Sequence, residues 1–197
     1  NGAELNGTWD KSDSVTELDT ATLTPSSVFA PSTWRDDNVR DLDLGSSSPV
    51  SVNAVQRLLI AGKRGVVYLL PAGGFGGVGS EIAQVRGCTA FGGAAVYDRI
   101  AVMPCKGENA IRALRVTRTG LSWAWTRSGV YSSPTIAGQR VYAADQRTGD
   151  LVILNLGNGA VVGRRPAGSL PHFPSQIISG NYVFVPTLTG VTAFQGH

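Results

Sequence analysis

Short apolar segments recur along the last three quarters of this 197-residue chain, and polar or glycine-rich stretches separate them. Four segments share one pattern, in which an arginine or a tyrosine precedes a run of apolar residues. They begin at residues 57, 99, 140 and 182, so their starts lie 42, 41 and 42 residues apart. A constant period of this size indicates a repeat architecture, in which one small unit stacks against copies of itself.

Two further landmarks keep the same period. A segment rich in small residues precedes each of these strands, and a second apolar strand follows it. The following strands are Val66 to Leu70, Ala110 to Leu114, Asp150 to Leu154 and Gly190 to Phe194. Turns such as Ala137-Gly138 are typical of hairpins between such strands. Three strands with room for a fourth in each repeat predict an all-β propeller built of four-stranded antiparallel blades.

The period also divides the chain. We expect blades over 45–87, 88–129 and 130–170, an incomplete blade over 171–197, and in 1–44 the end of a preceding blade plus a loop. That makes about four visible blades, either one propeller domain or the C-terminal part of a propeller with seven or eight. Because an open ring leaves a sheet edge unpaired, the sequence favours a fragment or one half of a nicked protein.

Composition agrees with an all-β fold. Glycine contributes 25 of 197 residues, which is typical of a chain with many turns. No window keeps the apolar spacing of an amphipathic helix, so helix should be minor. No apolar run approaches 18 residues, and we expect no transmembrane segment and no retained signal peptide.

One run in the third repeat resembles a known family motif. Gly149-Asp150-Leu151-Val152-Ile153-Leu154-Asn155-Leu156-Gly157-Asn158-Gly159 is similar to the pyrroloquinoline-quinone-type propeller repeat, where an apolar strand ending in Asp leads to a Thr-Gly turn and then to a Trp. Degenerate versions stand in the other repeats, for example at Gly65 to Leu70 and Gly190 to Phe194. The resemblance covers nearly the whole chain and implies the propeller fold.

The departures from this motif bear on function. The third repeat has Asn155, Asn158 and Gly163 where the motif has Asp, Thr and Trp, which predicts that the Trp contact between blades is lost there. Dehydrogenases of the family hold the quinone with an adjacent Cys-Cys disulfide, a catalytic Asp and a calcium ion. The two cysteines of this chain are not adjacent, so we expect no cofactor, no metal and no catalytic residue in it.

Charge is divided unevenly. Residues 1–44 hold nine acids and three bases, and residues 45–197 hold five acids and fourteen bases. Because the bases are spread over every repeat, they are typical of solvated strand edges rather than of a nucleic-acid site. We expect the partner to be another protein chain or the missing N-terminal half of a propeller, and not a nucleic acid.

Cys88 and Cys105 are the only cysteines, and their midpoint falls near the expected hairpin turn at Tyr97-Asp98. Antiparallel pairing would therefore bring them nearly opposite each other, which favours an intra-blade disulfide over two buried free thiols. A disulfide in turn indicates an oxidising compartment, so we expect a secreted, periplasmic or cell-envelope protein.

Other candidate residues lie in loops. The run Gly74 to Gly79 matches a dinucleotide-binding spacing, but no helix of useful length follows it, so we interpret it as a flexible blade connection. The candidate binding loops are represented by Asn6, Trp9, Phe75 and His172. For His172 the competing interpretation is a hydrogen-bonded loop residue, and for the tryptophans it is packing between blades.

Two functions remain open. The favoured one is a non-catalytic secreted or periplasmic propeller that acts as a binding or assembly scaffold, as do some members of the family it resembles. The alternative is the C-terminal half of a quinoprotein alcohol or sugar dehydrogenase, which would need pyrroloquinoline quinone and calcium. The fold is shared by both functions and does not decide between them.

Overall fold

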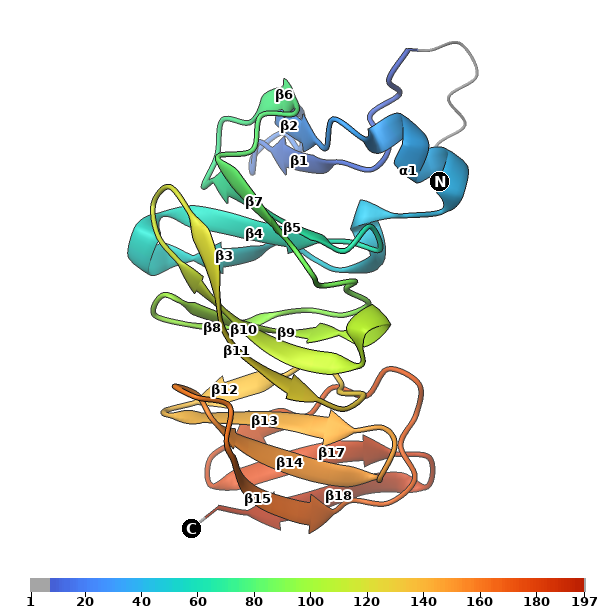
Figure 1. Cartoon of the computed structure of the whole chain (residues 1–197), viewed down its shortest axis with the longest axis vertical. Helices are drawn as coiled ribbons and strands as arrows, with labels where there is room; N and C mark the ends of the chain where they lie inside the picture. Colours follow the sequence, from blue (N-terminus) through green and yellow to red (C-terminus); the bar gives the residue numbers. More distant parts are fainter. Residues whose placement is uncertain (1–7, 197) are drawn as a thin grey trace.

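Five β-sheets, in which almost all neighbouring strands are antiparallel, follow one another along the long axis of the molecule (Figure 1). The computed structural model describes residues 8–196. We number the sheets from first to fifth in the order in which the chain builds them. The first sheet consists of β1 (Val15–Leu18), β2 (Pro25–Ala30) and β6 (Gly76–Val78). The fifth consists of β16 (Ile177–Ser179), β17 (Tyr182–Thr187) and β18 (Gly190–Gln195).

The three sheets between them have four antiparallel strands each. The second sheet comprises β3 (Val50–Val52), β4 (Arg57–Ala61), β5 (Val66–Pro71) and β7 (Ala83–Arg86). The third comprises β8 (Ala95–Tyr97), β9 (Ile100–Cys105), β10 (Ala110–Val116) and β11 (Leu121–Ser128). The fourth comprises β12 (Thr135–Ala137), β13 (Arg140–Asp145), β14 (Asp150–Asn155) and β15 (Val161–Pro166). The prediction of an all-β fold with four-stranded antiparallel blades is confirmed.

The core lies between the sheets. Side chains alternate across each strand, so one face of a sheet packs on the preceding sheet and the other face on the following one. One cluster joins the second and third sheets and contains Leu69 and Met103, and another joins the third and fourth and contains Ile111 and Val141. Both faces of the middle sheets are therefore buried, which explains why their central strands, such as β5 and β14, are apolar at most positions.

The glycine-rich run departs from the prediction. Gly74 to Gly79 is predicted to be a flexible connection, but Gly76–Val78 forms β6 and pairs in parallel with β2. The carboxylate of Glu17 helps to hold this excursion, because it accepts hydrogen bonds from Ser27 and from the backbone N–H of Gly74. Both hydrogen bonds favour the ionised form and lower the pKa of Glu17. A chain segment between two strands of the second sheet thus completes the first sheet.

The N-terminal part also contains structure that periodicity did not indicate. Strand β2 and the short helix α1 (Trp34–Arg40) precede the second sheet. Arg64 anchors the helix through ion pairs with Asp36 and Asp37, and Asp37 is almost fully buried. The described structure also has three single-turn helices, η1 (Leu44–Ser46), η2 (Asn53–Val55) and η3 (Lys106–Glu108). Within residues 8–196, no helix is long and apolar enough to cross a membrane.

Candidate binding surfaces

The disulfide predicted from the sequence is present. Cys88 and Cys105 are bonded, with Cα atoms 4.6 Å apart, and both side chains are fully buried. Their surroundings contain side chains from the second and third sheets, so the bond lies in the core between these sheets. The two cysteines do not meet as direct partners across the hairpin, although the sequence suggested it. Tyr97 pairs with Ile100, and the residue that bridges to Cys105 is Ala90 and not Cys88. The bond therefore ties the segment that leaves the second sheet to the end of β9.

The two N-terminal candidates for binding loops are Asn6 and Trp9. Asn6 lies outside the described residues. The Trp9 ring stands against that of Trp34, with centroids 6.5 Å apart, and its indole N–H donates to the backbone oxygen of Ser12. Trp9 is half-buried and packs on the helix rather than projecting from a loop.

Phe75 lies in the loop before β6, but its side chain packs inward. Its ring adds to the cluster around Phe29 and Tyr68, and its backbone N–H donates to Ser27. The side chain is half-buried. Together with β6, this contact places Phe75 in the packing of the first sheet on the second.

His172 lies on an exposed loop that two long side chains hold. Lys106 donates from Nζ to the backbone oxygen of His172 over 3.3 Å, and Gln146 donates to the same oxygen. The ring of Phe173 contacts that of His172 in a tilted arrangement, with centroids 4.2 Å apart, and its centroid lies 4.3 Å from Lys106 Nζ. Burial lowers the pKa of Lys106. The loop is thus anchored, and Phe173 remains 59% exposed beside a cation.

Two tryptophans of β11 point in opposite directions because the strand carries a β-bulge. Ala113 pairs with Trp125 and the next residue, Leu114, pairs with Trp123, so Ala124 is the extra residue. Trp123 turns toward the second sheet and donates to the backbone oxygen of Arg86 over 2.9 Å. The two indoles therefore fill the gaps on either side of the third sheet.

Trp125 docks on the fourth sheet. Its indole N–H donates to the backbone oxygen of Leu156 over 2.7 Å, and the ring is 8% exposed. Gly159 lies directly beneath it: a Cβ there would stand 2.5 Å from the ring, and the backbone φ of +68° itself favours glycine. Trp125 thus fills the space between the third and fourth sheets.

The next interface lacks this tryptophan, as the sequence predicts. Gly163 pairs with Ile153 immediately after the bulge residue Val162 in β15, just as Trp125 follows Ala124, so Gly163 occupies the position of Trp125. A Cβ at Gly163 would lie 3.2 Å from Cδ1 of Ile153, which shows that the isoleucine partly covers the glycine. In the third sheet the small residue, Ala113, is on β10 and the large one, Trp125, is on β11. In the fourth sheet the large residue, Ile153, is on β14 and the small one, Gly163, is on β15.

A groove of about 240 Å³ remains between the fourth and fifth sheets at this point. Its walls include Tyr142, Leu151 and Ile153 of the fourth sheet and Val183 and Phe194 of the fifth. It is partly open and mostly apolar, unlike the filled space around Trp125.

A polar anchor holds the fifth sheet on the fourth near the first strands. Gln176 is 3% exposed and donates from its side-chain nitrogen to the backbone oxygens of Ser133 and Tyr142, each over 2.7 Å. Its oxygen accepts from the Ser132 hydroxyl over 2.9 Å. This residue escaped the sequence analysis, although its small-residue segment was recognised as a repeat landmark. A glutamine within a segment of small residues is the sequence signal that could have indicated this buried polar anchor.

The outer face of the fifth sheet is apolar and uncovered. Val191 is 66% exposed, whereas its counterparts Ile111 and Leu151 are 0% and 1% exposed. Strand pairing places Ile177 beside Phe184 on the same face, and Ile177 is 65% exposed. We call the face formed by Ile177, Tyr182, Phe184, Pro186 and Val191 the open face. In the third and fourth sheets the equivalent face is buried against the next sheet.

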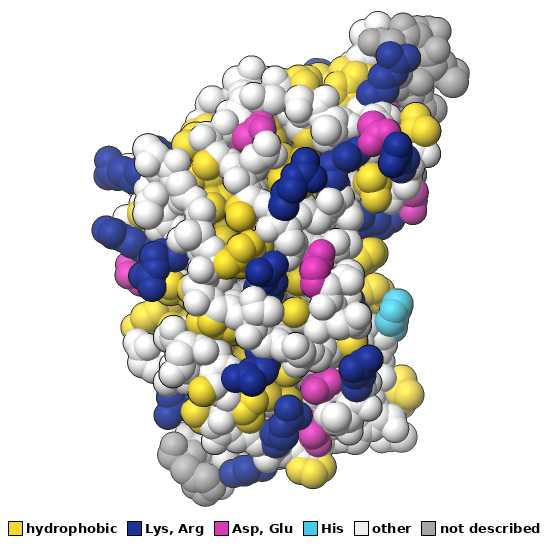
Figure 2. Space-filling view, viewed as in Figure 1, with side chains coloured by type: hydrophobic (Ala, Val, Ile, Leu, Met, Phe, Trp, Pro, Cys, Tyr) yellow, Lys and Arg dark blue, Asp and Glu magenta, His cyan; other side chains and the backbone are white. Residues whose placement is uncertain are grey.

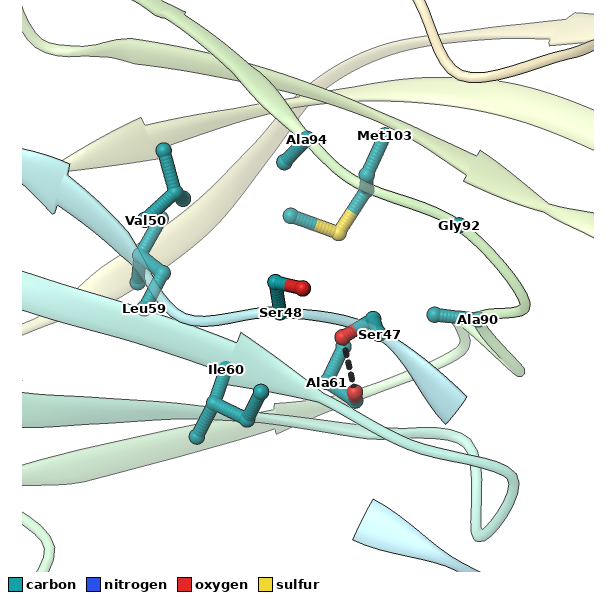
Figure 3. Close-up of a pocket in the computed structure, with 10 residues that line it drawn as sticks. All are labelled: Ser47, Ser48, Val50, Leu59, Ile60, Ala61, Ala90, Gly92, Ala94 and Met103. Carbon is teal, nitrogen blue, oxygen red and sulfur yellow. Dashed lines mark hydrogen bonds between the residues drawn. The ribbon is translucent and has the colours of Figure 1, made fainter. Parts of the chain in front are cut away.

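A second, much smaller cavity lies between the second and third sheets (Figure 3). Figure 3 shows the thioether of Met103 pointing toward Ser48. The cavity measures about 10 Å³, which is near the minimum for one water molecule. It is a packing gap and not a ligand site.

Charged side chains do not gather into one site on the visible face. Figure 2 shows Lys and Arg along the whole length of the molecule, with apolar patches between them. Within residues 8–196, no three His, Cys, Asp or Glu side chains are grouped so that they would hold a metal ion. Cys88 and Cys105 are bonded to each other across 17 residues, so they do not form the disulfide between adjacent cysteines that the family dehydrogenases use.

Known structures share this fold. No protein-family model and no curated protein matches the sequence. BamB from Moraxella catarrhalis superposes with a TM-score of 0.68 at 15% identity, over 94% of this chain and 52% of BamB. The dihydro-heme d1 dehydrogenase NirN superposes with a TM-score of 0.60 at 16% identity, over 94% of this chain and 39% of NirN. The propeller domain of Cps50 (Swd1) from Myceliophteria thermophila gives 0.60 at 12% identity, over 76% and 53%. The chain thus spans about half the length of BamB, and these similarities establish the β-propeller fold alone.

Proposed function

We propose that this chain is a non-catalytic, extracytoplasmic binding scaffold and that it presents the open face of its fifth sheet to a protein partner. The observation that carries the proposal is the exposure of Val191 and Ile177 at positions where the preceding sheets are buried between blades. Contiguous exposed apolar surface of this kind is typical of protein interaction sites. Tyr182 and Phe184 add aromatic surface, with ring centroids 6.0 Å apart.

Two further observations support the proposal. The buried disulfide is typical of proteins in oxidising compartments, which favours a secreted or periplasmic location. The docking of Trp125 beside Gly159 supports assigning the repeats to the pyrroloquinoline-quinone type. Members of that family include assembly scaffolds.

Site-specific photocrosslinking in the source cells tests the proposal. A photoreactive residue at position 191 should yield a discrete product with a second polypeptide, and the same residue at position 39 should not. Val39 is a suitable control because it is 82% exposed but lies on helix α1. If position 191 crosslinks only within its own polypeptide, the open face is an internal blade contact and the proposal is wrong.

The purified partner then allows a quantitative test. Ile177→Glu with Val191→Glu places two charges on the open face and should weaken binding at least a hundredfold, because charges at an apolar interface core are left desolvated. Leu23→Glu with Val39→Glu changes two exposed apolar residues elsewhere and should leave binding unchanged. Unchanged binding by the first pair would contradict the proposal.

The dehydrogenase alternative has its own test. Titration of the purified chain with pyrroloquinoline quinone and calcium should show no uptake, and no dye reduction with simple alcohols or sugars. Stoichiometric uptake with turnover would replace the scaffold with the enzyme.

A further inference from the structure

The groove between the fourth and fifth sheets has the same walls as the pocket that holds Trp125 between the third and fourth. The strand pairing of β9 with β10, β13 with β14 and β17 with β18 fixes which positions correspond. The corresponding pairs are Val102 and Tyr142, Ile111 and Leu151, and Ala113 and Ile153 on one wall, and Val141 and Val183, and Leu154 and Phe194 on the other. Every first member packs in the cluster that contains Trp125. The groove is therefore a tryptophan pocket without its tryptophan.

A hydrogen-bond acceptor is also in the corresponding place. The indole N–H of Trp125 donates to the backbone oxygen of Leu156, the residue after β14. Gly196 follows β18 in the same way and lines the groove. Its carbonyl accepts one hydrogen bond, from the side chain of Asn181 over 2.9 Å, and a carbonyl oxygen has a second lone pair. A ring N–H in the groove would thus find the acceptor that an indole uses one sheet earlier.

The groove differs from the Trp125 pocket in its charge. Arg140 and Arg165 both line it, and no Asp or Glu among the described residues does. Arg165 corresponds to Arg127 beside Trp125, but Arg140 takes the place of the apolar Ile100. The nearby carboxylates of the fourth sheet, Asp145 and Asp150, pair with Arg164 instead. Two guanidinium groups at an apolar groove favour a carboxylate, which each can bind in a bidentate manner.

We propose that this groove binds a small planar aromatic acid of the indole-carboxylate class. The ring would lie between Ile153 and Phe194, and the carboxylate would pair with one of the two guanidinium groups at the ends of the groove, that of Arg140 or that of Arg165. An apolar cavity of about 150 Å³ accommodates benzene, and drug-sized ligands fill about 300–1,000 Å³. The groove of about 240 Å³ therefore suits a two-ring molecule. The site is separate from the open face, so it does not depend on the proposed scaffold function.

Indole-3-acetate is the probe for the first test, with binding followed by calorimetry and by protein-observed NMR. We expect saturable one-to-one binding, with shift changes concentrated in β14, β15 and β18. The double variant Arg140→Gln with Arg165→Gln should weaken binding about tenfold, and neutral indole should bind more weakly than the acid by a similar factor. Arg115→Gln, an exposed arginine on β10, is the matched control and should change nothing.

Filling the groove from within is the decisive test. Ile153→Ala with Gly163→Trp recreates the Ala113 and Trp125 pair, and it should abolish probe binding while the protein stays folded. Phe194→Trp, which fills the groove from the other wall, should also abolish binding and covers the case in which the first variant does not fold. The absence of saturable binding up to about 10 mM, or binding that survives both fillings, would overturn the proposal. The pair Ile177→Glu and Val191→Glu should leave probe binding intact, which separates this site from the open face.

Discussion

The interface between the third and fourth sheets and the one between the fourth and fifth use the same positions for different purposes. In the first, Trp125 is buried beside Gly159, and its indole N–H reaches the adjacent sheet. In the second, Gly163 replaces the tryptophan, a groove remains, and Gln176 supplies polar bonds nearer the first strands. The difference shows that two changes in one cross-strand pair, from Ala113 and Trp125 to Ile153 and Gly163, leave a groove where the neighbouring interface has a structural contact.

The largest effect should come from removing the docking tryptophan. Trp125→Ala leaves a large cavity between the third and fourth sheets and should lower the free energy of unfolding by about 3–5 kcal/mol. Urea denaturation followed by circular dichroism measures this change. A loss below about 1 kcal/mol would show that Trp125 stabilises its interface no more than a typical side chain does, and would contradict the contrast between the two interfaces.

The disulfide should have the next largest effect, at a third interface. Replacing Cys88 and Cys105 by Ala should lower the free energy of unfolding by about 3 kcal/mol, because the closed loop of this length restricts the unfolded chain. The same denaturation assay, with reduced wild-type protein for comparison, measures it. Stability unaffected by either treatment would contradict a structural role.

Filling the groove should have the opposite sign. Ile153→Ala with Gly163→Trp should raise the free energy of unfolding by about 1–2 kcal/mol, since it buries an indole in space that is now open. Gly163→Trp alone should gain less, because Ile153 Cδ1 stands close to the new Cβ. Thermal unfolding of both variants provides the comparison. Destabilisation by the double variant would contradict the claim that position 163 is structurally equivalent to Trp125.

Truncation at the weaker interface should have the smallest effect. Phe194→Ala should cost only about 1 kcal/mol, because Phe194 packs on one side and borders the groove on the other. A cost equal to that of Trp125→Ala would show that the interface is as well packed as its neighbour.

The sequence predicted the regular parts of the fold from simple periodicity. The period of the strands beginning near residues 57, 99, 140 and 182 marks β4, β9, β13 and β17. The absence of a tryptophan at position 163 followed from the resemblance to the propeller repeat and not from the period. The Cys88 and Cys105 pair was also found, although by symmetry about a hairpin whose register excludes Cys88.

Other features depend on contacts that no local pattern carries. The parallel pairing of β6 with β2 joins a glycine run to a strand about fifty residues earlier, and β2 itself has no clear alternation. The opposite directions of Trp123 and Trp125 follow from one bulge residue, which side-chain alternation would not indicate. The open face became recognisable only when Val191 was compared with Leu151 in space.

Amide hydrogen exchange tests the contrast between the two interfaces most directly. Local stability follows buried contacts, so the amides of β17 should exchange faster than those of β13 in the unmodified chain. The variant with Ile153→Ala and Gly163→Trp should slow exchange in β17 and leave β13 nearly unchanged. Equal protection of the two strands, or no response of β17 to the filled groove, would contradict the account.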